Sequence, residues 1–152
     1  AERFGVATAC CEFRGVFTHP LSRVPFDAVT DARRCVQFLQ ASADNLGLDS
    51  EKIVLAGASS GGHLAAMAAL GRAAEEPGLR LAGLVLFNPV LDLRYGVGAL
   101  DQASPIEQVR PLAFPTLILH GTDDNLVPVE EVEAFEKQLQ RVGSECKLVT
   151  FP

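Results

Sequence analysis

Short apolar runs alternate along this chain with longer segments in which apolar residues recur at helical spacing. Three runs have the β-branched, apolar character of buried parallel strands. They are Ile53–Ala56, Leu81–Phe87 and Thr116–His120. Two further strands are predicted at Phe4–Cys11 and Cys146–Phe151. The pattern therefore predicts five strands separated by helical or irregular connections.

Helical periodicity is clearest over Phe26–Leu46 and Val129–Val142, and His63–Leu70 is rich in strong helix formers. Strand and helix alternate, with connections long enough for crossovers. We therefore expect a mostly parallel α/β sheet with helices on both faces, in a single domain spanning 1–152. Residues 91–113 lack periodicity and contain prolines, so they predict a surface excursion of the kind that forms substrate lids.

Composition narrows the classes of function. The chain has 152 residues, 48% of them hydrophobic and 21% charged, and a net charge of −6. An acidic chain without a Lys/Arg cluster is a poor partner for nucleic acid or an anionic membrane. No apolar run approaches the roughly 20 residues that span a bilayer. A cytoplasmic location is slightly favoured, secretion stays open, and the oligomeric state is not predicted.

The four cysteines are predicted to be small buried hydrophobes rather than disulfides or metal ligands. Cys10 and Cys11 are adjacent on a predicted strand, so their side chains should point to opposite faces. Neither Cys35 nor Cys146 completes the C-x-x-C spacing that is typical of metal sites.

The run Gly57–Gly62, with the sequence GASSGG, lies between a predicted strand and a predicted helix. A serine on a tight strand-to-helix turn flanked by glycines is the layout of a nucleophile elbow. This geometry would expose the Ser59 hydroxyl and aim the first helical N–H groups at the same space. The alternative is an ordinary strand–helix turn.

A second candidate lies after the strand that ends at His120. Sheets of this type carry their chemistry at the carboxyl ends of the strands. Asp124, in the following Gly/Pro-braced loop, could orient a histidine, and Asp123 is the fallback. The alternative is a surface turn with solvated aspartates. The order serine, then acid, agrees with one class of catalytic triad.

Taken together, these stretches resemble the α/β-hydrolase superfamily. The resemblance is to its lipase/esterase branch, which includes acetyl-xylan and feruloyl-type esterases, and it covers essentially the whole chain. The motifs that carry it, in order, are Cys11–Arg14, Pro25–Ala32, Leu48–Ile53, Gly57–Ala65, Asn88–Asp92, Ser104–Ile106 and His120–Asp124.

The resemblance implies a serine carboxylic-ester hydrolase that acts on small or carbohydrate-linked acyl esters through an acyl-enzyme. Ser59 would be the nucleophile, Ser60 N–H half of the oxyanion hole and Asp124 the catalytic acid, with no metal or organic cofactor. The family's catalytic histidine is expected beyond Pro152. Its oxyanion loop, and a strand that separates Phe4–Cys11 from the elbow strand, are expected before Ala1. These 152 residues alone are therefore expected to be inactive.

Other assignments stay open. His63 is expected to pack beneath the site, His120 to be a structural hydrogen-bonding residue, and His19 to lie in a Pro-bounded loop, so none fits the role of general base well. A serine peptidase of the prolyl-oligopeptidase type shares both motifs. A non-catalytic α/β-hydrolase scaffold that binds a ligand or protein is the third hypothesis. The small excursion favours short acyl groups such as acetate.

Overall fold

A four-stranded parallel sheet is the centre of the molecule. The computed structural model describes residues 4–14, 24–71, 79–93 and 101–152. The strands follow the chain order β1-β2-β3-β4, and each pairs in parallel with the next. Their bounds are Val54–Ala58 (β1), Gly83–Phe87 (β2), Thr116–Gly121 (β3) and Cys146–Phe151 (β4). Four of the five predicted strands are therefore confirmed, with boundaries shifted by at most two residues.

The helices also follow the predicted periodicity. They are α1 (Val24–Ala41), α2 (Ala43–Leu46), α3 (Ser60–Leu70) and α4 (Val129–Arg141), with short 3₁₀ turns at Asp101–Ala103 and Pro105–Gln108. The helix predicted over Phe26–Leu46 is divided at Ser42 and ends at Gly47, whose left-handed conformation (φ 66°) closes the last turn.

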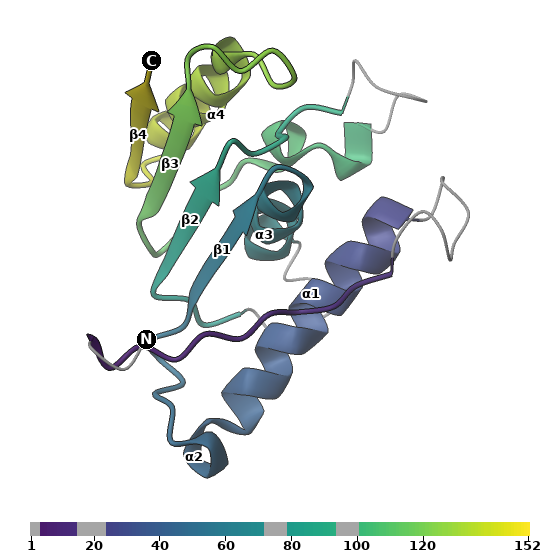
Figure 1. The fold of residues 1–152 in the computed structure, drawn as a ribbon, viewed down its shortest axis with the longest axis vertical. Coiled ribbons are helices and arrows are strands. Elements are labelled where there is room, and N and C mark those ends of the chain that lie inside the picture. Colours follow the sequence, from purple (N-terminus) through teal and green to yellow (C-terminus); the bar gives the residue numbers. More distant parts are fainter. Residues whose placement is uncertain (1–3, 15–23, 72–78, 94–100) are drawn as a thin grey trace.

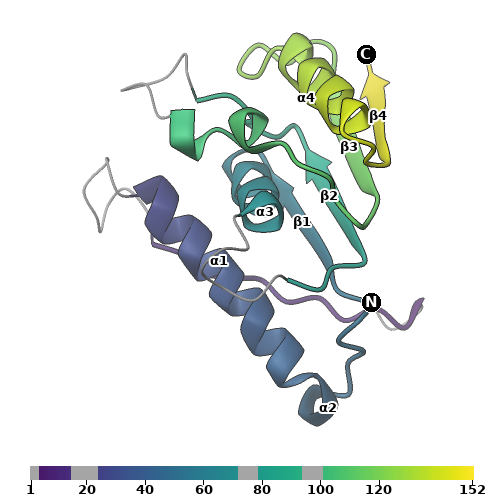
Figure 2. The same cartoon turned by 180° about the vertical axis from the view of Figure 1, so that it is seen from behind.

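The helices that contact the sheet, α3 and α4, cover one of its faces (Figures 1 and 2). Helix α1 packs against α3, on the side of α3 that faces away from α4. The second helical layer that the sequence predicts, on the opposite face, is not found among the described residues. Phe87 and Phe151 are correspondingly exposed, at 43% and 47%.

The core lies between the sheet and the covering helices. Leu84, Leu86 and Ile118 from the strands meet Phe135 and Leu139 of α4, and all five are essentially buried. Helix α3 is buried along nearly its whole length because the sheet lies on one side of it and α1 on the other. The helix that follows the elbow is therefore held rigidly.

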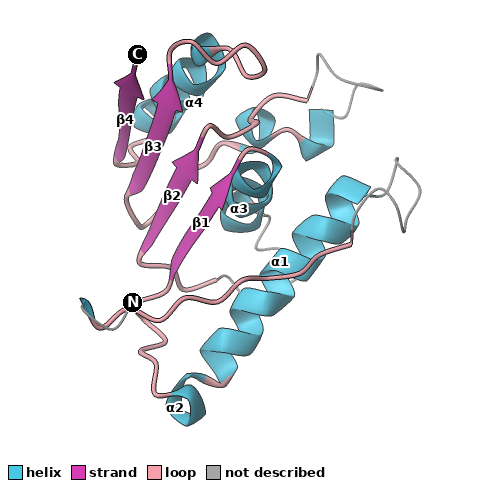
Figure 3. Ribbon diagram, viewed as in Figure 1, coloured by secondary structure: helices cyan, strands magenta, loops and turns pink. Residues whose placement is uncertain are grey.

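The predicted strand Phe4–Cys11 is wrong. Residues 6–14 have no regular secondary structure, and the first strand in Figure 3 is β1. No strand of the described chain runs beside them. An extended segment without a neighbouring strand has no ladder to satisfy its backbone groups. Residues 6–13 instead stay exposed to solvent, and the Arg14 N–H donates to the Asp31 carboxylate at 3.0 Å.

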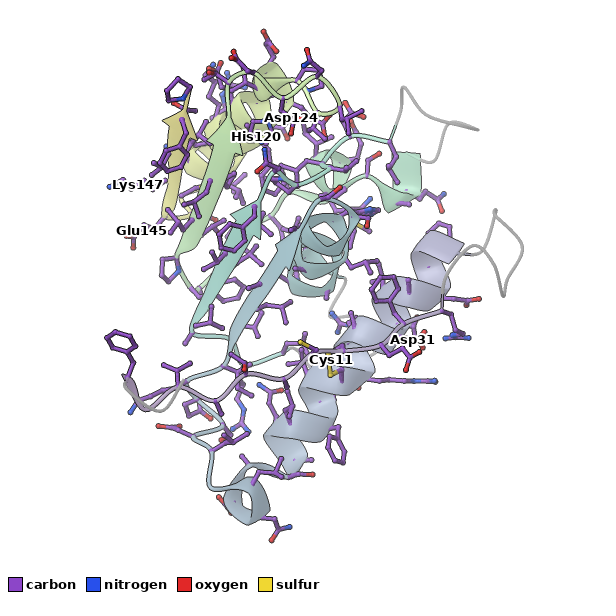
Figure 4. The ribbon with its side chains drawn as sticks, in the orientation of Figure 1. Cys11, Asp31, His120, Asp124, Glu145 and Lys147 are labelled. Carbon is purple, nitrogen blue, oxygen red and sulfur yellow. A yellow bond between two sulfur atoms is a disulfide. The ribbon has the colours of Figure 1, made fainter. Side chains whose placement is uncertain are left out.

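The prediction of four buried, unpaired cysteines is also wrong at Cys10, Cys11 and Cys35. Cys11 and Cys35 form a disulfide that ties the N-terminal segment to α1 (Figure 4), and Cys10 is an exposed thiol. Adjacent side chains point in opposite directions, so the argument that Cys10 and Cys11 cannot share a partner holds. It does not prevent one of them from pairing elsewhere. Cys146 is buried as expected, and burial raises the pKa of its thiol to about 12.

An ion pair reinforces this attachment of the N-terminal segment. The Arg14 guanidinium donates to both carboxylate oxygens of Asp31 on α1, at 2.8 and 2.7 Å. This bidentate contact lowers the pKa of Asp31 to about 2. Segment and helix are therefore joined by the disulfide and by the ion pairs of Arg14 with Asp31 and, at 3.9 Å, with Asp27.

Candidate active site

The parallel arrangement brings the ends of β1, β2 and β3 to one edge of the sheet (Figure 1). Ser59 follows β1 directly, Asn88 follows β2, and Asp124 lies in the loop that follows β3. The two residues predicted to carry the chemistry, Ser59 and Asp124, are therefore at the same edge of the sheet.

Ser59 has the backbone conformation of a sharp elbow, with φ 52° and ψ −120°. A positive φ is unfavourable for a residue with a Cβ and persists only where the surroundings impose it. Here the Ser59 N–H donates to the Phe87 carbonyl at 2.9 Å, and its own carbonyl accepts the His63 N–H at 3.1 Å. Ser59 remains exposed at the end of the strand.

Two glycines make this turn possible. A Cβ on Gly57 would lie 2.2 Å from the Gly61 carbonyl oxygen, and one on Gly62 would lie 2.8 Å from the Cβ of Pro89. Both distances are too short for a real Cβ. At Gly61 a Cβ would meet open space. Close packing therefore requires glycine at positions 57 and 62. Packing does not require glycine at position 61.

Helix α3 begins at Ser60, so the Ser60 N–H belongs to its first turn. Donors of the first turn have no partner within the helix, and the helix dipole favours negative charge there. The N–H groups that follow the elbow are thus available to an anionic oxygen next to Ser59.

Asp124 is held by three donors. Its Oδ1 accepts the N–H groups of Leu126 at 2.8 Å and Val127 at 3.0 Å, and its Oδ2 accepts the side-chain amide of Asn88 at 2.9 Å. These bonds lower the pKa of Asp124, the Val127 N–H most and then those of Leu126 and Asn88. The three hydrogen bonds therefore favour the ionised form of Asp124, whereas the fallback residue Asp123 is exposed.

The described histidines are buried and do not lie open beside Ser59. His120 is fully buried, and its Nε2 bonds the Val127 carbonyl at 2.9 Å, so it supports the loop that carries Asp124 (Figure 4). His63 is 6% exposed on α3, and burial lowers the pKa of its imidazole to about 4. His19 lies outside the described residues.

Two residues near the site were not predicted. Asn88 reaches Asp124, as described above. Glu131 of α4 accepts the N–H groups of Leu91 and, at 2.7 Å, of Asp92. It thereby holds the first residues of the excursion, and its burial raises the pKa of its carboxyl. An asparagine next to a proline directly after a strand was the available signal for Asn88; no local pattern marks Glu131.

The described residues hold no cluster of three or more His, Cys, Asp or Glu that could bind a metal ion. Nor is any helix in the described ranges both long and apolar enough to cross a membrane.

The fold and these two motifs define an α/β-hydrolase. The BD-FAE family model matches residues 3–92, so the chain belongs to the BD-FAE family. The model of the prolyl oligopeptidase family matches residues 88–152.

Relatives and solved structures agree with this class. A probable carboxylic ester hydrolase, LipM of Mycobacterium tuberculosis, is 27% identical over 78% of this chain and 35% of its own length. A probable isoprenylcysteine alpha-carbonyl methylesterase of Oryza sativa is 28% identical over 99% of this chain and 44% of its own. Esterase 2 of Thermogutta terrifontis, phosphoramylated by tabun, superposes with a TM-score of 0.79 at 33% identity, over 92% of this chain and 57% of its own. The chain thus spans about a third to just over a half of the proteins it matches.

Proposed function

We propose that this chain supplies the nucleophile and the acid of a serine carboxylic-ester hydrolase. The observation that carries the proposal is the exposed, strained Ser59 at the same sheet edge as an ionised, triply hydrogen-bonded Asp124. The esterases among the relatives and solved structures support it.

In the proposed mechanism the Ser59 hydroxyl attacks the acyl carbonyl while a histidine takes its proton. Ser60 N–H donates to the oxygen that becomes negative, and the histidine then protonates the leaving alcohol. Water hydrolyses the resulting acyl-enzyme with the same histidine as base. Asp124 orients that histidine and stabilises its charged form. His63 and His120 are not proposed for this role, because both are buried.

Reaction with a fluorophosphonate tests the nucleophile in the complete protein. Such a probe forms a covalent bond with an activated serine, so the wild type should be labelled and the Ser59→Ala variant should not. Ser60→Ala, which keeps the backbone N–H, is the matched control and should still be labelled. Labelling that survives Ser59→Ala would overturn the proposal, and an unlabelled wild type would favour the non-catalytic scaffold.

Small acyl esters are the proposed substrates, with carbohydrate-linked acyl esters as one source. Solved forms of the Thermogutta esterase 2 include propionate-bound and butyrate-bound ones, which supports short acyl groups. Turnover of p-nitrophenyl acetate should therefore exceed that of a long-chain p-nitrophenyl ester. Faster turnover of the long chain would contradict this preference.

A serine peptidase is the second candidate, because the prolyl oligopeptidase model matches residues 88–152, which include the acid loop. The two activities differ in the leaving group. An amine must be protonated before it leaves the acyl carbon, whereas an alcohol depends less on this protonation. Comparison of a peptide anilide with the p-nitrophenyl ester of the same acyl group separates them. Turnover of the ester alone supports the esterase.

A further inference from the structure

Asn88 lies between the two halves of the proposed site. It directly follows β2 and has φ 43°, a left-handed conformation that asparagine tolerates better than most residues. Its backbone N–H donates to the Leu119 carbonyl at 2.9 Å, which continues the pairing of β2 with β3 beyond the last strand residue. The backbone of Asn88 is thus fixed, and its side chain extends to Asp124.

With the donors that the described residues supply, the Asp124 carboxylate has room for one further donor on the oxygen that Asn88 contacts. Two oxygens offer about four acceptor positions between them. Oδ1 already accepts two backbone N–H groups, and Oδ2 accepts one, from Asn88 at 2.9 Å. The remaining position is on Oδ2. A histidine N–H that bonds this carboxylate must therefore approach beside the Asn88 amide.

The same short segment also holds the nucleophile. Ser59 N–H donates to the Phe87 carbonyl at 2.9 Å, and Val90 N–H donates to the Ser59 carbonyl at 3.3 Å. We call residues 87–90 the bridge. Its backbone binds Ser59, and its side chain at Asn88 binds Asp124. Because the bridge is attached to both, it sets where the acid lies relative to the nucleophile.

We propose that Asn88 is a positioning residue, which directs the free lone pair of Asp124 toward the histidine of the triad. This inference rests on the proposed function and names a residue within the same site. The side-chain amide of Asn88 donates to Asp124 at 2.9 Å, so in this proposal Asn88 acts through Asp124.

The test is a double-mutant cycle in the complete protein, with Asn88→Gly and Asp124→Asn alone and together. Glycine accepts the left-handed backbone, so Asn88→Gly removes the amide without adding strain. We expect kcat for p-nitrophenyl acetate to fall roughly tenfold or more with KM within about twofold, because the loss affects the transition state. Each kcat is calculated from the concentration of active sites, which titration with a fluorophosphonate measures. Asn125→Gly, at an exposed position of the acid loop, is the matched control.

The combined variant separates positioning from a structural role. If Asn88 acts through Asp124, Asn88→Gly costs nothing further once Asp124 is Asn, because coupled residues are non-additive. An equal loss in both backgrounds, or an unchanged kcat in Asn88→Gly, overturns the inference and leaves the proposed function standing. If Ser59→Ala is still labelled, the proposed function itself fails.

The Asn88→Asp variant provides a second test, through the pH–rate profile. It places a carboxylate beside Asp124, and we expect the acid limb of the pH–rate profile to shift.

Discussion

The carbonyl oxygen of Gly61 lies 2.2 Å from the place that a Cβ on Gly57 would occupy. The end of β1 and the first turn of α3 therefore touch backbone to backbone, with no space for a methyl group between them. Neither backbone can move without disturbing the elbow that carries Ser59.

Gly57→Ala should consequently destabilise the protein by at least about 3 kcal/mol, at the upper end of the usual cost of overpacking. Gly61→Ala is the matched control. Its Cβ would meet open space, and alanine is favoured over glycine within a helix by up to about 1 kcal/mol. Denaturant unfolding of both variants measures the difference. Equal stability of the two would contradict the close contact described here.

Backbone strain at Ser59 predicts a second difference. With φ 52° and ψ −120°, a residue with a Cβ is disfavoured by about 1–3 kcal/mol, whereas glycine is not. Part of this gain is offset because glycine makes the unfolded chain more flexible. Ser59→Gly should therefore be more stable than Ser59→Ala by about 1 kcal/mol, although both lack the hydroxyl. Thermal or denaturant unfolding compares them, and a more stable Ser59→Ala would show that the elbow is unstrained.

The disulfide gives a third prediction. Cys11 and Cys35 are separated by 24 residues, and closing a loop of that size stabilises a fold by about 3 kcal/mol in the chain-entropy account. Cys35→Ala should lower the stability toward that amount and speed proteolysis within residues 4–14. Cys10→Ala removes a thiol outside the disulfide and should leave both unchanged. If neither Cys35→Ala nor chemical reduction of the disulfide changes the stability or the rate of proteolysis, the disulfide does not hold the N-terminal segment.

The sequence predicted the four strands of the sheet and the turns that carry Ser59 and Asp124 because their signals are local. An apolar run followed by glycines around Ser59 is contained within a few residues, and so is the turn that holds Asp124. The failures involve distant partners. Whether Phe4–Cys11 becomes a strand depends on a neighbour in the sheet, and whether Cys11 pairs depends on where α1 places Cys35.

Asn88 was missed for the same reason. Its position after β2 is visible in the sequence, but its role depends on the loop after β3, 36 residues further along the chain. Glu131 is similar, since it bonds backbone groups about 40 residues away. Parallel topology brings such residues together at one sheet edge, and no periodicity within a single element reports that contact.

The buried histidine of α3 should make stability depend on pH. Burial lowers the pKa of His63 from 6.5 to about 4, so the unfolded chain binds this proton more readily than the folded one. The associated stability is present above pH 6.5 and is lost as the pH falls toward 4. A shift of this size corresponds to about 3 kcal/mol.

His63→Leu removes the titrating group and keeps an apolar side chain among its buried neighbours. We expect the fall in unfolding free energy between pH 7 and pH 4 to be smaller in this variant, by about 3 kcal/mol, than in the wild type. Carboxylates that titrate in the same range contribute equally to both proteins and cancel in the comparison. Denaturant unfolding at the two pH values measures it. Parallel pH dependence in the two proteins would mean that His63 protonates as easily in the folded state as in the unfolded chain.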